Sequence, residues 1–189
     1  MGFISQLSKQ FLIAMPGLQD PNFSHSVTFL CEHNPQGAMG LLINRPTPMN
    51  LGDLTRQLGI GIDMDEPDTA HIPIYRGGPV QPDQGFVLHT PQGEWDNTLE
   101  LGSDLALTVS QDIIEAISHG LGPEKFMITL GYAGWGAGQL EEEIAANSWL
   151  NGPADNRIIF DTPQDQRWTT AAALLGVELS LISSDVGHA

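Results

Sequence analysis

The chain has 189 residues, of which 23 are aspartate or glutamate and 7 are lysine or arginine, so its formal net charge is −16. Because nucleic acids and anionic membranes attract clustered lysine and arginine, this composition argues against direct nucleic-acid binding and against a membrane surface as partner. Cys31 is the single cysteine and cannot form an intrachain disulfide, and the apolar run from Phe11 to Met15 is too short for a signal peptide. We expect one cytoplasmic domain over residues 1–189.

The first half of the chain favours strands joined by short connections. Apolar runs predict strands at Phe11–Met15, Val27–Cys31 and Ala38–Asn44, with a polar hairpin loop between the last two. Asn50 is a suitable N-cap for a helix over residues 51–58 that places Leu51, Leu54 and Leu58 on one face. Residues 59–73 show little periodicity and predict a surface loop.

The second half alternates strands and helices. Arg76 to Pro79 predicts a sharp turn, and Ser110 is expected to cap a helix that ends at His119, before Gly120. Further strands are predicted at residues 85–90, 99–101, 106–109, 126–130, 157–160 and 177–182, a glycine-rich loop at 131–138, and helices at 139–149 and 167–175. This mixture predicts an α+β fold with a mixed sheet.

The segment 126–160 combines strand, glycine-rich loop, helix and strand, an order also found in nucleotide-binding units. The glycines at 131, 134, 136 and 138 do not give the G-x-G-x-x-G spacing, and Glu141 to Glu143 would repel a pyrophosphate. The alternative is a tight connection whose glycines permit close packing. We therefore predict no nucleotide cofactor.

Cys31 and His33 form a second candidate, because residues two apart on a strand share a face and a nearby imidazolium can activate a thiol. The alternative is a buried cysteine that acts as a small hydrophobic side chain. The six histidines show neither H-x-x-x-H nor H-E-x-x-H spacing, so no metal site is predicted.

Arg45 and Arg76 form a third candidate, since each follows an apolar segment at a sharp turn, where rigid scaffolds present binding residues. We expect these arginines, Gly77–Gly78 and the segment from Trp135 to Gln139 to converge on one concave site. A guanidinium pair suits a small carboxylate or an acidic peptide. The alternative is that the arginines form ion pairs with nearby acids such as Glu32, Asp53 or Glu141.

Long ordered motifs resemble the YqgE/AlgH family from about residue 9 to the end of the chain. They are FLIAMPGLQDPNFSHSV (11–27), CEHNPQGAMGLLINRP (31–46), RGGPV (76–80), GFVLHT (85–90), LGYAGWGAGQLEEEI (130–144), NSWL (147–150) and GHA (187–189). The resemblance implies an α+β fold with a bifurcated, mixed, partly barrel-like sheet surrounded by helices. These proteins are bacterial and cytoplasmic, most have no assigned function, and some carry a transcriptional-regulator label.

The resemblance also implies that the motif residues come together in space. They are Cys31, Glu32, His33, Asn34, Arg45, Arg76, Gly77, Gly78, Pro79, Gly134, Trp135, Gln139, Leu140 and Trp149. Gly17 and Gly136 stand where the family commonly has aliphatic residues or alanine. We expect a non-enzymatic regulatory or binding module without cofactor, whose partner is an unknown protein or small acidic ligand and whose effect on transcription, if any, is indirect. The alternative is a redox sensor or enzyme that depends on Cys31.

Overall fold

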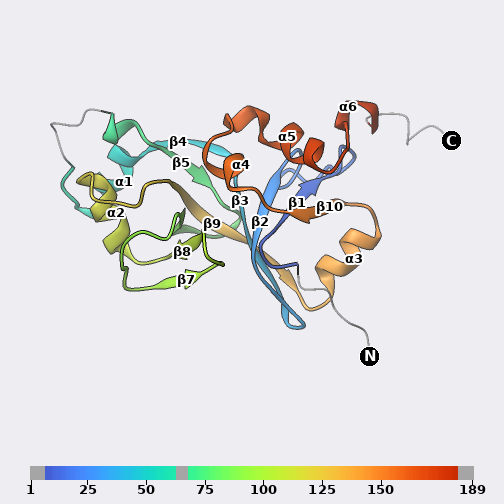
Figure 1. The fold of residues 1–189 in the computed structure, drawn as a ribbon, viewed down its shortest axis with the longest axis horizontal. Helices are drawn as coiled ribbons and strands as arrows, with labels where there is room; N and C mark the ends of the chain where they lie inside the picture. Colours follow the sequence, from blue (N-terminus) through green and yellow to red (C-terminus); the bar gives the residue numbers. More distant parts are fainter. Residues whose placement is uncertain (1–6, 63–67, 183–189) are drawn as a thin grey trace.

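A curled sheet of ten strands forms within residues 7–62 and 68–182, the parts of the chain that the computed structural model describes (Figure 1). The strands are β1 (Gln10–Ala14), β2 (Val27–Asn34), β3 (Gly37–Leu42), β4 (Pro46–Asn50), β5 (Pro73–Arg76), β6 (Val80–His89), β7 (Thr98–Glu100), β8 (Ala106–Thr108), β9 (Phe126–Gly136) and β10 (Trp149–Pro153). The order β10-β1-β2-β3-β9-β6-β8-β7 is antiparallel throughout, whereas β5 lies parallel to β9 and makes the sheet mixed.

The sheet divides at β9, which confirms the expected bifurcation. β6 pairs with β9 from Phe126 to Tyr132, β5 pairs with it at residues 128–130, and β3 pairs with it at residues 133–136. The connection from β5 to β6 therefore crosses the backbone of β9. A Cβ atom on Gly78 would lie 2.1 Å from the carbonyl carbon of Tyr132, so this crossing requires glycine.

Helices cover both faces of the sheet around three apolar clusters. α4 (Asn156–Phe160), α5 (Arg167–Leu174) and α6 (Leu179–Ile182) pack on one face, over a cluster that includes Phe11 and Phe29. On the other face, α1 (Leu51–Leu58) and α2 (Gln111–Ser118) cover one end of β9, and α3 (Gln139–Ala145) covers the other. Short 3-10 helices occupy residues 69–71 and 164–166. Figure 1 shows α1 and α2 at one end of the long axis and α3 at the other.

The predicted helix cap at Asn50 is confirmed. The Asn50 side chain accepts a hydrogen bond from the Asp53 amide at 2.9 Å, and the Asp53 carboxylate accepts one from the Asn50 amide at 3.0 Å. Two N–H groups at the start of α1 thus obtain partners that the helix itself cannot provide. Gly59, at φ 69°, ends the helix in the left-handed conformation.

Three predicted elements have a different structure. Residues 131–136 continue β9 instead of forming a loop: residues 133–136 pair with β3, and Gly131 permits the close approach of Gly78. The predicted strand at 157–160 is α4, which begins where the Asp155 side chain accepts a hydrogen bond from the Arg157 amide. The predicted strand at 177–182 contains α6 instead, and short apolar runs of this kind fit a buried helix as well as a strand.

Three strands of the structure are not predicted from the sequence. β4 and β5 lie in segments where turns or a loop were expected, and β10 begins at Trp149, the last residue of the helix expected over 139–149, and continues where no element was expected. β4 contains Pro46 and Pro48, which weaken any strand signal, and it pairs only with β5. Edge strands of this kind have a sequence pattern too short and irregular to recognise.

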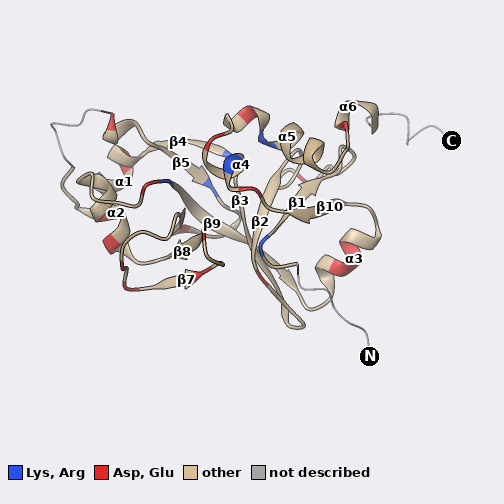
Figure 2. Cartoon of the chain, viewed as in Figure 1, with Lys and Arg blue, Asp and Glu red and all other residues tan. Residues whose placement is uncertain are grey.

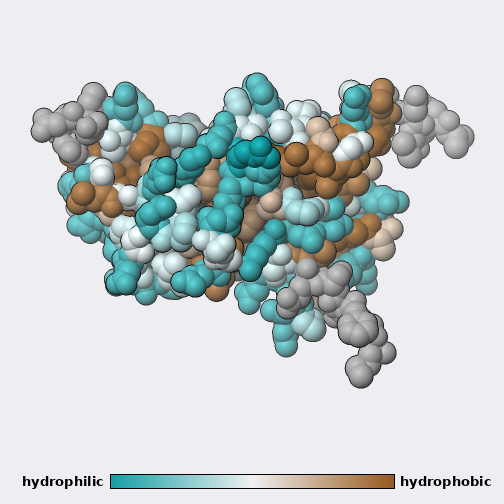
Figure 3. All heavy atoms as spheres, viewed as in Figure 1, coloured by the Kyte–Doolittle hydropathy of each residue, from teal (hydrophilic) through white to brown (hydrophobic). Residues whose placement is uncertain are grey.

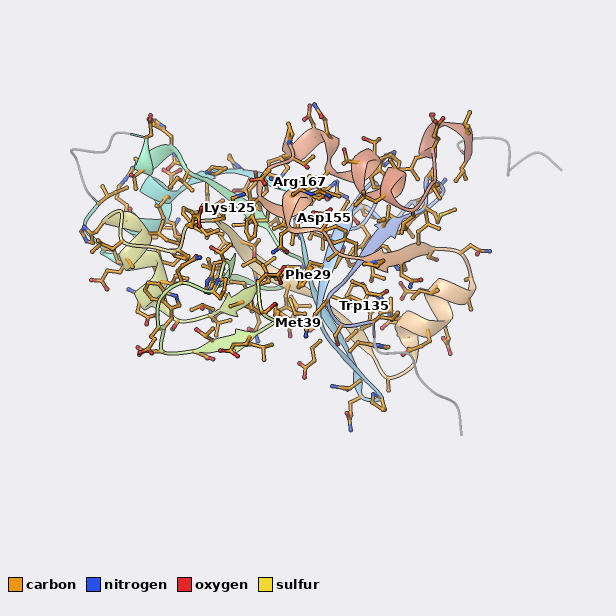
Figure 4. All side chains as sticks on the ribbon, in the orientation of Figure 1. Phe29, Met39, Lys125, Trp135, Asp155 and Arg167 are labelled. Carbon is orange, nitrogen blue, oxygen red and sulfur yellow. The ribbon has the colours of Figure 1, made fainter. Side chains whose placement is uncertain are left out.

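Arg167 joins α5 to the sheet and is only 5% exposed (Figure 4). Its guanidinium group donates hydrogen bonds to the carbonyl oxygens of Thr162 and Ile43, and its Cζ lies 5.1 Å from the centre of the Tyr75 ring. Within the described residues no carboxylate lies within ion-pair distance of this cation. Two carbonyl dipoles and an aromatic face therefore hold a buried positive charge.

Candidate functional site

Arg45 and Arg76 lie directly opposite each other where β4 and β5 meet. Pro46 is paired with Tyr75 in this antiparallel ladder, and the Arg76 amide donates a 2.8 Å hydrogen bond to the Arg45 carbonyl. Residues opposite each other in an antiparallel pair share a face, with Cβ atoms about 5 Å apart. The structure thus brings together the two arginines that the sequence indicated.

The two guanidinium groups are close enough to influence each other. Burial lowers the pKa of Arg45, and the nearby charge of Arg76 lowers it further. The Arg45 guanidinium donates a hydrogen bond to the Ser24 carbonyl. In residues 7–62 and 68–182 neither arginine lies within ion-pair distance of a carboxylate.

Two of the acids proposed as ion-pair partners of the arginines contact other residues. Asp53 pairs with Arg56 at 3.3 Å, and Glu141 contacts the ring of His33 at 2.5 Å. The structure therefore does not support the alternative in which acidic side chains hold Arg45 and Arg76 in place. In a chain this acidic, two adjacent cations form a local positive spot, and Figure 2 shows most visible basic segments near the middle of the molecule.

Trp135 and Gln139 lie away from the arginines, so the expected single site of six residues is not formed. Trp135 lies five residues along β9 from Leu130, the partner of Arg76, a distance of roughly 16 Å at the usual rise of a strand. Its indole is 5% exposed, packs against Trp149 and donates to Glu143. The Gln139 side chain accepts a hydrogen bond from the Gly136 amide. Figure 4 shows Trp135 at the end of β9 remote from Lys125.

Gly77 and Gly78 are next to the arginine pair but have a structural role. Gly77 lies beside Gly131, where an added Cβ would come within 2.3 Å of the Gly131 carbonyl oxygen. These glycines therefore let the chain cross β9 and set the position of Arg76 at the end of β5.

Cys31 and His33 do not share a face, because a β-bulge between Leu30 and Glu32 makes Cys31 an extra residue in β2. The Cys31 side chain is buried in the cluster under α4 and α5, where burial, and then the charge of Glu32, raise the pKa of the thiol far above its usual range. The His33 ring lies on the other face, where Nδ1 accepts a hydrogen bond from the Leu7 amide at 3.0 Å.

The Cys31 thiol is expected to be unreactive in the folded protein. A buried thiol with a raised pKa provides almost no thiolate, which is the reactive form. Titration with Ellman's reagent at pH 8 should show slow modification of the native protein and rapid modification of one thiol per chain in denaturant. Rapid reaction of the native protein would instead support the hypothesis of a redox role.

A groove with apolar walls from α1 and α2 lies over the sheet, and one of its lining residues, Leu130, is the β9 partner of Arg76. Its volume is about 280 Å³, and it is lined by Leu54, Leu58, Asp83, Gln84, Gly85, Val87, Thr108, Val109, Ser110, Gln111, Ile114 and Leu130. Sequence reasoning did not find this groove. One signal was available, since Leu58 belongs to the apolar face of α1 and yet remains 41% exposed.

Other surfaces are less informative. The face seen in Figure 3 is mostly hydrophilic, with hydrophobic atoms gathered near α5 and α6, where Leu174 and Leu181 are exposed. In the part of the chain that the structure describes, no three side chains of histidine, cysteine, aspartate or glutamate are grouped to hold a metal ion. No helix among those residues is long and apolar enough to span a membrane.

The curled mixed sheet that divides at β9, with helices on both faces, defines the class of fold, and solved structures share it. The solution structure of the AlgH protein from Pseudomonas aeruginosa aligns with a TM-score of 0.78 and 52% identity, over 100% of this chain and 99% of that one. A crystal structure of protein DIP2367 from Corynebacterium diphtheriae has a TM-score of 0.74 over 97% of this chain and 95% of that one; at 20% identity it supports the fold alone.

Sequence comparison identifies the family. The family model described as AlgH-like matches residues 11–180. A UPF0301 protein of Thioalkalivibrio sulfidiphilus is 55% identical over 98% of both chains, and one of Chromobacterium violaceum is 54% identical over 97% of both. The chain therefore belongs to the AlgH-like family.

Proposed function

We propose that this protein is a non-enzymatic binding module of the bacterial cytosol that holds an anionic ligand, a small carboxylate or the acidic side chain of a partner, on Arg45 and Arg76. The observation that carries the proposal is that Arg45 and Arg76 lie opposite each other in a strongly acidic chain, and that among the described residues neither has a carboxylate within ion-pair distance. A bound carboxylate would accept charge-assisted hydrogen bonds and offset the repulsion between the cations.

The scaffold around the pair supports this role. Arg45 is partly buried and held by the Ser24 carbonyl, whereas Arg76 is exposed at the end of β5. One guanidinium group is therefore fixed and the other is accessible to solvent. A reaction has no comparable support, because Cys31 is buried and the ring of His33 contacts Leu7 and Glu141. An effect on transcription would act through a partner, since 23 acidic residues against 7 lysines and arginines disfavour contact with nucleic acid.

Succinate is a suitable small dicarboxylate probe for this site. Titration followed by ¹H–¹⁵N NMR should shift the backbone amides of Arg76, Gly77 and Thr47, and the affinity should fall with rising salt. Arg76→Gln should weaken binding roughly 10- to 100-fold, the value of one or two charge-assisted hydrogen bonds. The melting temperature should not fall, because removing Arg76 also removes repulsion of Arg45.

Arg157→Gln provides a matched control. Arg157 has the same charge, its side chain is 79% exposed, and it pairs with Asp155 at the start of α4, on the opposite face of the sheet. This variant should bind succinate as the unmodified protein does. Equal weakening by both variants would show a nonspecific charge effect, and a large loss of stability in Arg76→Gln would assign the pair a structural role; either result contradicts the proposal.

A further inference from the structure

A row of paired residues crosses four segments of the sheet beside the arginine pair. Arg45 lies opposite Arg76, and Arg76 is paired with Leu130 of β9. Leu130 is in turn paired with Gly85 of β6. Paired residues share a face and neighbouring strands lie about 4.8 Å apart. One step along the row therefore leads from the exposed guanidinium of Arg76 to the side chain of Leu130.

Leu130 and Gly85 form part of the apolar groove. Gly85 contributes no side chain, and no other atom lies within 4 Å of the position that its Cβ would occupy. Leu54, Leu58 and Ile114 provide apolar walls from α1 and α2. The groove is therefore open space with apolar walls on the α1 and α2 side, and its lining residue Leu130 is the strand partner of Arg76.

We infer that the ligand of this site is an amphipathic monocarboxylate, with its carboxylate on Arg45 and Arg76 and an unbranched apolar chain in the groove. This inference rests on the proposed function and names the class of its ligand. A volume of about 280 Å³ accommodates a chain of roughly eight to ten carbons, if each carbon takes about the volume of a water molecule, ~30 Å³.

The polar residues of the groove are consistent with this orientation. Asp83 and Gln84 belong to the bulged start of β6, which lies on the far side of β9 from Arg76. A carboxylate bound at Arg76 on β5 would therefore be separated from Asp83 on β6 by the intervening strand β9. A ligand bound in the reverse direction would place its charge next to Asp83, which electrostatic repulsion disfavours.

Calorimetric titration with decanoate, acetate and 1-decanol tests the inference with the full-length protein. Decanoate should bind at least about 100-fold more tightly than acetate, because the groove removes most of its chain from water. 1-Decanol has the same chain without the charge and should bind at least about 10-fold more weakly than decanoate. Arg76→Gln should reduce decanoate binding to the level of 1-decanol.

Gly85→Leu should fill the groove and weaken decanoate binding at least about 10-fold while leaving acetate binding unchanged. Gly17→Leu is the matched control, because a Cβ at Gly17 also meets no atom within 4 Å and the residue lies outside the groove. If Gly85→Leu does not fold, Leu58→Ser provides the test at an exposed position, and it should weaken decanoate binding selectively in the same way.

The outcomes separate this inference from the proposed function. If succinate binds through Arg76 but decanoate binds no more tightly than acetate, the anion site stands and the amphipathic ligand is rejected. If decanoate binds equally to the Arg76→Gln variant, the groove acts without the arginines and the inference is overturned. If no carboxylate binds, both proposals fail.

Discussion

Replacing Arg167 with methionine is expected to lower the free energy of unfolding by about 3–5 kcal/mol, the cost of leaving buried carbonyl groups without a donor and losing a contact between a cation and an aromatic ring. The carbonyl oxygens of Ile43 and Thr162 would lose their donor, and the Tyr75 ring would lose its cation. For a chain of this size the melting temperature should fall by roughly 8–15 °C. Urea unfolding followed by circular dichroism measures the change.

Arg56→Met is the matched control for this prediction. The Arg56 side chain is 80% exposed and makes one surface ion pair with Asp53, an interaction usually worth less than about 1 kcal/mol. Arg167→Lys should be nearly as destabilising as Arg167→Met, since an ammonium group cannot reproduce the planar arrangement of donors. Equal stability of Arg167→Met and Arg56→Met would mean that water replaces the guanidinium group.

Gly78→Ala is expected to destabilise the fold by more than about 3 kcal/mol or to prevent folding, because a methyl group must overlap with the backbone of β9. Its Cβ would lie 2.1 Å from the carbonyl carbon of Tyr132 and 2.4 Å from the Ala133 nitrogen. Neither atom belongs to a flexible side chain, so the two chain segments would have to separate. The yield of soluble protein and the urea midpoint measure the effect.

Gly85→Ala introduces the same methyl group seven residues later, where no atom lies within 4 Å of the Cβ position. Its stability should stay within about 1 kcal/mol of the unmodified protein, since replacing glycine at an unstrained position also reduces the entropy of the unfolded chain. Similar losses in the Gly78 and Gly85 variants would show that the crossing over β9 does not restrict residue 78.

Helices and strands whose signals lie within a few residues of one another could be predicted from the sequence. α1 has an N-cap at Asn50, leucines at helical spacing and Gly59 as its stop, and all of these signals act within ten residues. The apolar runs of β2 and β3 on either side of a short polar turn predict a hairpin there, and the structure has it, with β2 extended to Asn34. The family resemblance added the divided sheet, which no local pattern indicates.

Elements that depend on contacts between residues far apart in the sequence could not be predicted. The glycines of β9 favour a loop when the sequence is considered alone, and the need for one of them, Gly131, becomes clear only from the segment Gly77–Gly78 that crosses it. The same holds for Cys31 and His33. Their spacing predicts a shared face, but the bulge at Cys31 belongs to the pairing of β2 with β3 and cannot be recognised in one strand.

The candidate site was predicted in part. Arg45 and Arg76 were selected because arginines are rare in this chain and both follow apolar segments, and the pairing of β4 with β5 does place them together. The segment from Trp135 to Gln139 is predicted at the site because it follows an apolar strand, contains glycines and carries an indole and an amide, but the burial of Trp135 against Trp149 and Phe23 places it in an apolar cluster. The groove could not be predicted, because most of its lining residues come from α1, α2 and β6, which are far apart in the sequence.

The position of β9 in the sheet also determines the order in which this chain can fold. β3, β5 and β6 all precede β9 in the sequence and all pair with it, and Gln10 of β1 pairs with Pro153 of β10. Such distant pairings have a high contact order and fold slowly, in milliseconds to seconds. During synthesis β3, β5 and β6 emerge before residues 126–136 and have edges without a partner until β9 is made. We expect the nascent chain to aggregate most readily at these edges and to need a chaperone there.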